Sequence, residues 1–311
     1  MMHMNTQERL KWRGIAMLLF TALIWGTAFA AQRIAGQYIG AFTFNAVRFL
    51  IGAATLLPVL AVSVCRSRRM GRPMDLGGRK LVVGGVLCGT ALFLAGNLQQ
   101  FGIEETTAGK AGFITALYIV LVPIFSIPLK KRPGLATWIG TAVALAGMYL
   151  LCMKEGFTVS TGDLYVLCCA VCFAVQILLI DHYSPVVNGV ALSCIQFVVA
   201  GALGLIPALL LENPTVSAVL AAWQPILFVG ILSCGVAYTL QILAQRHVPA
   251  PVASLIMSLE SVFAALAGVL LLHETMSGRE VIGCALMLAA VLLVQLWRPG
   301  QRKHPRKAVR A

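Results

Sequence analysis

Residues 81–102 read LVVGGVLCGTALFLAGNLQQFG, and these 22 residues include no charged side chain. A helix needs about 20 mostly apolar residues to cross the hydrocarbon core of a bilayer, so this stretch predicts a transmembrane helix. Similar runs occupy most of the rest of the chain. The ten predicted spans are approximately residues 13–31, 41–64, 81–102, 108–129, 134–153, 163–181, 188–211, 223–245, 249–272 and 278–297. We therefore expect an all-α integral membrane protein with ten transmembrane helices.

The composition of the whole chain agrees with a bilayer as its solvent. Of its 311 residues, 59% are hydrophobic and 11% are charged, whereas about a quarter of the residues are charged in an ordinary soluble domain. These values exclude a soluble or a disordered protein. The net charge of +13 would favour nucleic-acid binding in a soluble chain, but the basic residues lie in short clusters between the apolar runs. We therefore expect contact with lipid and none with nucleic acid.

The distribution of Lys and Arg predicts the orientation of the spans. With the N-terminus in the cytoplasm, inner segments carry 19 basic residues and outer segments carry 4. Basic residues gather on the cytoplasmic side of membrane proteins, so we expect both termini, the basic tails 1–12 and 298–311, in the cytoplasm of a plasma (bacterial inner) membrane. The first run ends in Ala28-Phe29-Ala30, like a signal-peptide cleavage site. Its length and Trp25-Gly26 favour a retained helix.

The two halves of the chain resemble one another. Residues 85–88 match residues 230–233, and at the same offset Phe93 corresponds to Tyr238 and Gln100 to Gln245. Arg48-Phe49 in the second span likewise matches Gln196-Phe197 in the seventh. We infer two five-helix repeats, residues 13–153 and 163–297. Units with an odd number of spans cross the membrane in opposite senses, an arrangement typical of secondary transporters. The alternative is chance similarity between Leu-, Ala- and Gly-rich helices.

Polar and aromatic side chains recur at helical spacing within several spans. The third span has Thr90, Phe93, Asn97 and Gln100, and the eighth has Cys234, Tyr238, Gln241 and Gln245. Polar groups avoid lipid, so these faces point toward protein or water. The residues predicted to bind a small-molecule substrate are Trp25, Phe93, Asn97, Gln100, Thr115, Tyr118, Gln176, Tyr238, Gln241 and Glu260. The alternative role of the amides is hydrogen bonding between helices.

Two charges lie within predicted spans. Glu260 falls near the middle of the ninth span, where a carboxylate points to function by default. It is a candidate to bind a substrate ammonium group or to carry a coupling proton, and the alternative is a structural carboxyl group. Arg48 lies inside the second span near the outer face. Its candidate roles are snorkelling, hydrogen bonding to carbonyls, and binding a substrate carboxylate.

The sequence lacks the motifs that are typical of catalytic and metal-binding sites. The chain has no H-E-x-x-H, G-x-S-x-G or Walker A motif and no paired aspartates within spans. The lone C-x-x-C at Cys169 and Cys172 has no second pair at zinc spacing. We therefore expect no catalytic residues, no metal and no cofactor. A membrane-embedded enzyme and a channel or receptor scaffold remain the alternatives to a transporter.

Several stretches resemble the EamA-type transporters of the drug/metabolite transporter superfamily. They are residues 107–118, Val122-Pro123, residues 253–266, Trp25-Gly26 and residues 48–50. The resemblance covers about residues 13–297 and implies ten helices, cytoplasmic termini, and export or exchange of small metabolites, often amino acids. Two positions depart from the family pattern. Ser261 replaces the usual Pro, so we expect a straighter ninth helix, and His273 replaces the Gly before Glu274.

Together these observations predict a monomeric secondary transporter. It would export a small metabolite, an amino acid or similar compound, by alternating access between the two repeats. Protons are the candidate coupling ion.

Overall fold

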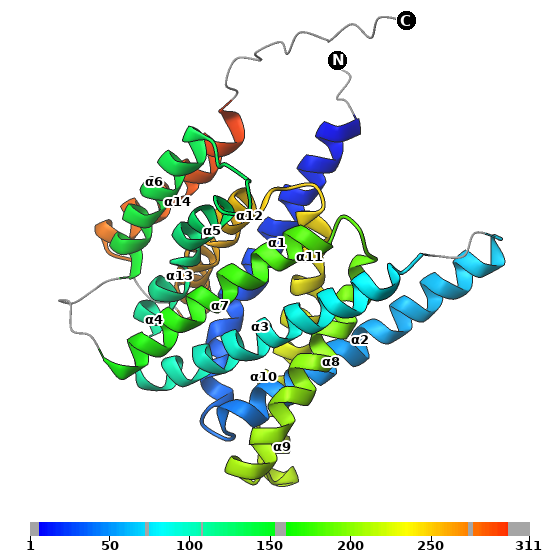
Figure 1. Cartoon of the computed structure of the whole chain (residues 1–311). Helices are drawn as coiled ribbons and strands as arrows, with labels where there is room; N and C mark the ends of the chain where they lie inside the picture. The colour runs from blue at the N-terminus through cyan, green and yellow to red at the C-terminus, as the bar shows by residue number, and fades with distance from the viewer. Residues whose placement is uncertain (1–5, 72–74, 107, 153–159, 273–275, 298–311) are drawn as a thin grey trace, which may run out of the picture.

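A computed structural model describes residues 6–71, 75–106, 108–152, 160–272 and 276–297 of the chain. Residues 1–5 and 298–311 of the predicted tails, and the His273-Glu274 pair, lie outside these described residues. The described part consists of helices joined by short connections and has no strand (Figure 1). Within it, nine helices are long and apolar enough to cross a bilayer, and Lys110–Ser126 is a shorter apolar stretch. The all-α membrane fold is confirmed.

The helices follow the ten predicted spans closely. They are α1 (Thr6–Ala35), α2 (Ala41–Arg69), α3 (Gly78–Glu105), α4 (Ala108–Thr115), α5 (Tyr118–Ser126), α6 (Leu135–Cys152), α7 (Thr161–Tyr183), α8 (Gly189–Pro207), η1 (Ala208–Glu212), α9 (Val216–Ala221), α10 (Trp223–Leu227), η2 (Phe228–Tyr238), α11 (Thr239–Gln245), α12 (Ala250–Met257), α13 (Glu260–Leu272) and α14 (Gly278–Leu296). The fourth span consists of α4 and α5, the eighth of α10, η2 and α11, and the ninth of α12 and α13. The short helix α9 was not predicted.

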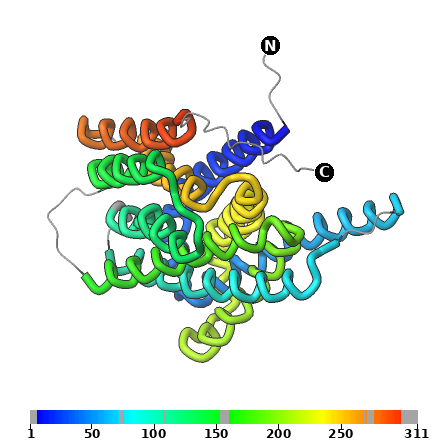
Figure 2. Tube along the Cα trace, turned by 45° about the horizontal axis from the view of Figure 1, so that its top comes forward, coloured from blue at the N-terminus to red at the C-terminus, as the bar shows by residue number. Residues whose placement is uncertain are grey.

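The most extensive helix contacts join one half of the chain to the other. α2 packs along α8, and α6 packs along α14; the second pair lies side by side in both views (Figures 1 and 2). The contact between α3 and α7 has a counterpart in the contact of α1 with η2 and α11. This matched pairing is the arrangement expected of two inverted five-helix repeats.

Aromatic and small residues make the contacts where equivalent helices cross. The rings of Phe49 and Phe197 stack with centroids 6.2 Å apart and planes 8° apart. Gly147 on α6 and Gly283 on α14 bring their helices into close contact. A Cβ added to Gly147 would lie 2.7 Å from the carbonyl oxygen of Gly283, and one added to Gly283 would lie 2.6 Å from that of Gly147. Small residues at such crossings let membrane helices approach closely.

The fourth and ninth spans are both broken, and the two breaks are equivalent. In each span a two-residue turn separates the half-helices: α4 ends at Thr115 and α5 begins at Tyr118, whereas α12 ends at Met257 and α13 begins at Glu260. At the second break the Ser258 hydroxyl donates to the carbonyl of Leu255 at 2.8 Å. Such bonding to the preceding turn bends helices. The expectation of a straighter ninth helix was wrong, because the span breaks without a proline.

Candidate functional site

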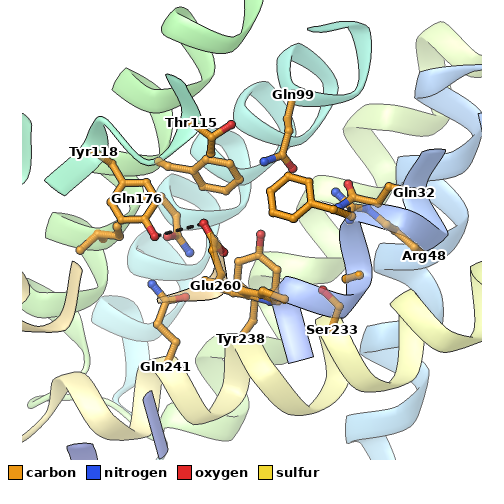
Figure 3. A pocket seen from close by; sticks show the side chains of 15 residues that line it. Gln32, Arg48, Gln99, Thr115, Tyr118, Gln176, Ser233, Tyr238, Gln241 and Glu260 are labelled. Atoms are coloured by element: carbon orange, nitrogen blue, oxygen red, sulfur yellow. Dashed lines mark hydrogen bonds between the residues drawn. The ribbon is translucent and has the colours of Figure 1, made fainter. Parts of the chain in front are cut away.

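A cavity lies where the two broken spans meet (Figure 3). The cavity volume is about 40 Å³, below the roughly 300–1,000 Å³ usual for small-molecule sites, so the surrounding helices would have to move apart to admit a metabolite. Its lining is Trp25, Ala28, Phe29, Gln32, Arg48, Gln99, Thr115, Tyr118, Phe173, Gln176, Ile177, Ser233, Tyr238, Gln241 and Glu260. Seven of the ten predicted site residues therefore line one cavity. Helices from both halves of the chain contribute to it.

The two breaks touch each other through Tyr118 and Glu260. Each is the first residue of the second half-helix in its span. The Tyr118 hydroxyl donates a hydrogen bond to Oε1 of Glu260 at 3.3 Å, drawn as a dashed line in Figure 3. Glu260 is 5% exposed, and its position at the N-terminus of α13 lets the helix dipole favour a negative charge. The carboxyl group thus lies at the centre of the bundle and faces the cavity.

Glycine at position 26 lets α1 pass directly over this second break. A Cβ on Gly26 would lie 2.6 Å from the carbonyl oxygen of Glu260 and 2.8 Å from the backbone nitrogen of Ala264. No larger residue fits there without displacing α13. The preceding residue, Trp25, then places its ring against Tyr238, with centroids 4.6 Å apart. Gly26 thereby fixes both the aromatic wall of the cavity and the position of Glu260.

Arg48 supplies the positive charge of the cavity. Its side chain is buried at 2% exposure. Nε donates to Oδ1 of Asn45 at 2.8 Å, and one terminal nitrogen donates to Oε1 of Gln32 at 3.4 Å. The guanidinium carbon also lies 5.1 Å and 4.8 Å from the ring centroids of Phe44 and Phe49. These contacts orient the guanidinium group, whose five N–H donors leave several for a ligand.

Neither Glu260 nor Arg48 has an oppositely charged partner among the described residues. In the described part of the chain, the ion pairs are Lys110 with Asp163 and Lys131 with Asp181, and neither includes Glu260 or Arg48. Buried charges are costly unless they are paired. Figure 3 shows Glu260 near the middle of the cavity and Arg48 at its edge, on different helices. The lining of the cavity therefore contains one buried acidic group and one buried basic group.

Several buried polar atoms in the lining also have no protein partner. They are Nε1 of Trp25, both amide atoms of Gln176 and Oε1 of Gln241. Buried polar groups in native proteins nearly always have partners. The orphaned atoms include both donors and acceptors, and they surround the same space as Glu260. A polar ligand or water in the cavity would satisfy them.

The three other predicted site residues lie away from the cavity. Phe93 stacks on Phe42 with ring centroids 6.5 Å apart. Oδ1 of Asn97 accepts a hydrogen bond from Asn45 at 3.1 Å, and Gln100 donates to the backbone oxygen of Gln32 at 3.4 Å. The amides on this face of α3 thus bond to neighbouring helices, which was the alternative role given to them. A binding role for these three residues stays a prediction.

The sequence pattern missed other lining residues, and a change of helix type explains one of them. The α-helical spacing paired Cys234 with Tyr238, but the structure places Ser233 in the cavity beside Tyr238. Residues 228–238 form the π-helix η2, in which residues five apart share a face. Cys234 instead packs under Gly52. Gln32 and Gln99 were also missed, although each is an amide near the end of an apolar run.

Comparison with known proteins gives consistent matches along the chain. The model of the EamA-like transporter family matches residues 12–153 and 160–296. A protein of Archaeoglobus fulgidus named "Uncharacterized transporter" is 33% identical over 285 residues, covering 90% of this chain and 84% of its own. The "Uncharacterized inner membrane transporter YedA" of Escherichia coli K12 is 26% identical over 299 residues, covering 92% of this chain and 91% of its own. A protein of known crystal structure shares the fold, with a TM-score of 0.74 at 20% identity, over 91% of this chain and 96% of its own.

Proposed function

Because the chain belongs to the EamA-like transporter family, we propose that it exports a small zwitterionic metabolite, such as an amino acid, across the plasma membrane. The observation that carries this proposal is the charge pattern of the central cavity. Among the described residues that line it, Glu260 is the only acid and Arg48 the only base. A zwitterion supplies the ammonium group for Glu260 and the carboxylate for Arg48, so its binding offsets both buried charges.

The rest of the lining favours a neutral amino acid over a sugar or a polyamine. The rings of Trp25, Tyr238 and Phe173 provide an apolar surface for a side chain. The orphaned amide of Gln176 and the Nε1 atom of Trp25 add a few oriented polar contacts. Such a mixture of apolar walls and few directed polar groups is typical of small-molecule sites.

We further propose that the carrier works by alternating access, with Gln100 and Gln245 as matched closures. Nε2 of Gln100 donates to the backbone oxygen of Gln32 at 3.4 Å, and Nε2 of Gln245 donates to that of Ile177 at 3.0 Å. Each pair is separated by 68 residues, and Gln100 corresponds to Gln245 in the repeat.

The two acceptor residues, Gln32 and Ile177, both line the cavity. They belong to α1 and α7, which are the first helices of the two halves. Gln100 therefore lies at the end of the cavity that the charge distribution assigns to the outside, and Gln245 lies at the end that it assigns to the cytoplasm.

Protons are the proposed coupling ion, and Glu260 is their proposed carrier. An empty carrier must return without an unpaired charge in the bilayer. A proton on Glu260 removes that charge, and the substrate ammonium replaces the proton in the loaded state. The two ligands would then compete for one carboxyl group, and this competition couples their movements in opposite directions.

Counterflow in proteoliposomes tests the proposed substrate class. The purified chain would exchange radiolabelled neutral amino acids, and would not exchange their N-acetyl or methyl ester derivatives, each of which lacks one of the two charges. Liposomes without protein provide the background. Equal exchange of the blocked derivatives, or no exchange of any amino acid, would overturn the proposal.

A further inference from the structure

A second and larger cleft lies beyond the inner end of the central cavity. Its volume is about 550 Å³, and its lining includes Thr137, Asp181, Gln245 and Arg246. This is the side that the charge distribution assigns to the cytoplasm. The cleft has no role in the central site described above.

The cleft continues the central cavity along two helices. On α7, Ile177 lines the cavity and Asp181 lines the cleft; on α11, Gln241 lines the cavity and Gln245 lines the cleft. Residues four apart lie on one face of a helix and about 6 Å apart along its axis. One helical turn of protein therefore separates the two spaces.

Hydrogen bonds and an ion pair hold the helices together in the layer between the cavity and the cleft. Gln245 bridges α11 to α7 through the carbonyl of Ile177 at 3.0 Å. Oδ1 of Asp181 accepts from the backbone nitrogen of Ala250 at 2.9 Å, and its other oxygen pairs with Lys131. Asp181 thus holds the inner ends of the fourth, sixth and ninth spans together. A solute in the cleft lies directly behind this closure.

The cleft also has the chemistry of a binding site. Gln245 is 3% exposed, and its Oε1 atom has no partner. Arg132 and Arg246 line the cleft, and neither pairs with a carboxylate in the part of the chain that the structure describes. Among the described residues of the lining, the only acid is Asp181, and it is already paired with Lys131. The unpaired positive charge attracts anions and raises their local concentration.

We propose that this cleft is a second substrate site, in which Arg132 and Arg246 capture the carboxylate of the substrate before the inner closure opens. This inference rests on the proposed function, because it requires a substrate with a carboxylate. An anionic phospholipid headgroup offers similar chemistry to basic pockets at this membrane surface. The position of Gln245, deep in the cleft and one turn from the central cavity, favours a solute on its way to that cavity.

Transport kinetics measured separately at the two faces test the proposal. The substrate is the neutral amino acid exchanged most rapidly in the counterflow panel, presented to the inner face in inside-out vesicles and to the outer face in right-side-out vesicles. The test variant carries Arg132→Gln and Arg246→Gln. The matched control carries Arg68→Gln and Arg69→Gln, which remove the same charge from exposed positions on the same predicted side that do not line the cleft.

The double variant is expected to raise the inner-face KM on the order of tenfold, with kcat and the outer-face KM unchanged. Acetate should compete at the inner face of the wild type and lose this effect in the variant, whereas the control should behave as wild type. High salt should reduce the difference, because screening weakens exposed charges. An unchanged inner-face KM in the double variant would overturn the inference and leave the proposed function standing.

Vesicles of phosphatidylcholine alone distinguish the two sources of the anion. If the wild type still has the lower inner-face KM there, the carboxylate of the substrate is the ligand. If its KM rises to that of the variant, the cleft binds an acidic lipid headgroup and the substrate assignment is overturned. If the wild type transports no amino acid, the proposed function fails, and this inference fails with it.

Discussion

Tyr118 donates a hydrogen bond to Glu260 at 3.3 Å, and each residue begins the second half-helix of a broken span. The two residues occupy equivalent places in the two halves of the chain, yet one is a phenol and the other a carboxyl group. The repeat thus supplies a symmetric framework, and its sequence differences create an asymmetric site. Broken helices that meet near the middle of the membrane are a recurrent way to build transporter sites.

Replacing the Glu260 carboxyl group should abolish the coupling of transport to protons and leave folding of the chain unchanged. Glu260→Gln keeps the shape of the side chain and removes its charge. We expect substrate affinity to fall by about 10- to 100-fold, since hydrogen bonds to charged groups contribute about 1.5–3 kcal/mol. Transport driven by a pH gradient should be lost. Proteoliposome uptake with and without a pH gradient measures both effects, and normal expression with unchanged coupling would remove Glu260 from the mechanism.

Tyr118→Phe is the matched control for that variant. It removes the hydrogen bond to Glu260 and leaves the carboxyl group in place. We expect weaker binding by about 1 kcal/mol with the response to a pH gradient retained. If Tyr118→Phe abolished the response as completely as Glu260→Gln, the carboxyl group would not be the specific proton carrier.

Arg48 should determine recognition of the substrate carboxylate. Arg48→Gln is expected to weaken binding of an amino acid at least tenfold and to leave binding of the corresponding amine, which lacks the carboxylate, nearly unchanged. Arg48→Lys should not restore affinity, because an ammonium group cannot reproduce the planar contacts to Asn45 and Gln32. Competition against a radiolabelled amino acid measures these affinities. Equal losses for the amino acid and the amine would instead indicate a structural role for Arg48.

The matched glutamines should bias the carrier in opposite directions. Gln245→Ala removes the closure at the inner end, and Gln100→Ala removes the closure at the outer end. Each loss of about 1 kcal/mol corresponds to a roughly fivefold shift between the two states. Thiol labelling from each side of the membrane reports this shift. Shifts in the same direction, or none, would contradict the assignment of these residues as paired closures.

Gly26 should be intolerant of a side chain. In Gly26→Ala the new Cβ would meet the backbone of Glu260 and Ala264, and overpacking of this kind costs about 1–3 kcal/mol. We expect a lower melting temperature in detergent and weaker substrate binding. Gly112→Ala is the control, because nothing lies within 4 Å of its added Cβ. Equal behaviour of the two variants would exclude a tight contact between α1 and the second break.

The transmembrane framework was predictable from the sequence because it depends on length and hydrophobicity. In the described part of the chain, the runs of about 20 apolar residues located the nine helices that are long enough to cross a bilayer and the shorter apolar stretch Lys110–Ser126. The matched positions of Phe49 and Phe197 in the two halves likewise agree with the stacking of their rings. Glu260 was identifiable as well, since a carboxyl group is rare and costly within a bilayer.

The break within the ninth span, the π-helix and the orientation of single side chains were not predictable from the sequence. They depend on hydrogen bonds that the spacing of residue types does not reveal. Serine bonding to the preceding turn accompanies the break before Glu260, where the missing proline suggested a straight helix. The π-helix moved Ser233 into the cavity in place of Cys234. Whether an amide such as Asn97 faces a ligand or a neighbouring helix depends on partners distant in sequence, here Asn45.

We propose that one cavity opens alternately to the two sides of the membrane between the inverted repeats. A cysteine-free chain with a single thiol at Ala28→Cys in the cavity, or at Thr137→Cys in the inner cleft, tests it with a membrane-impermeant maleimide. We expect Ala28→Cys to react from the outside and Thr137→Cys from the inside, and we expect substrate to change the two rates in opposite directions. Reaction of both thiols from the same side would contradict the claim.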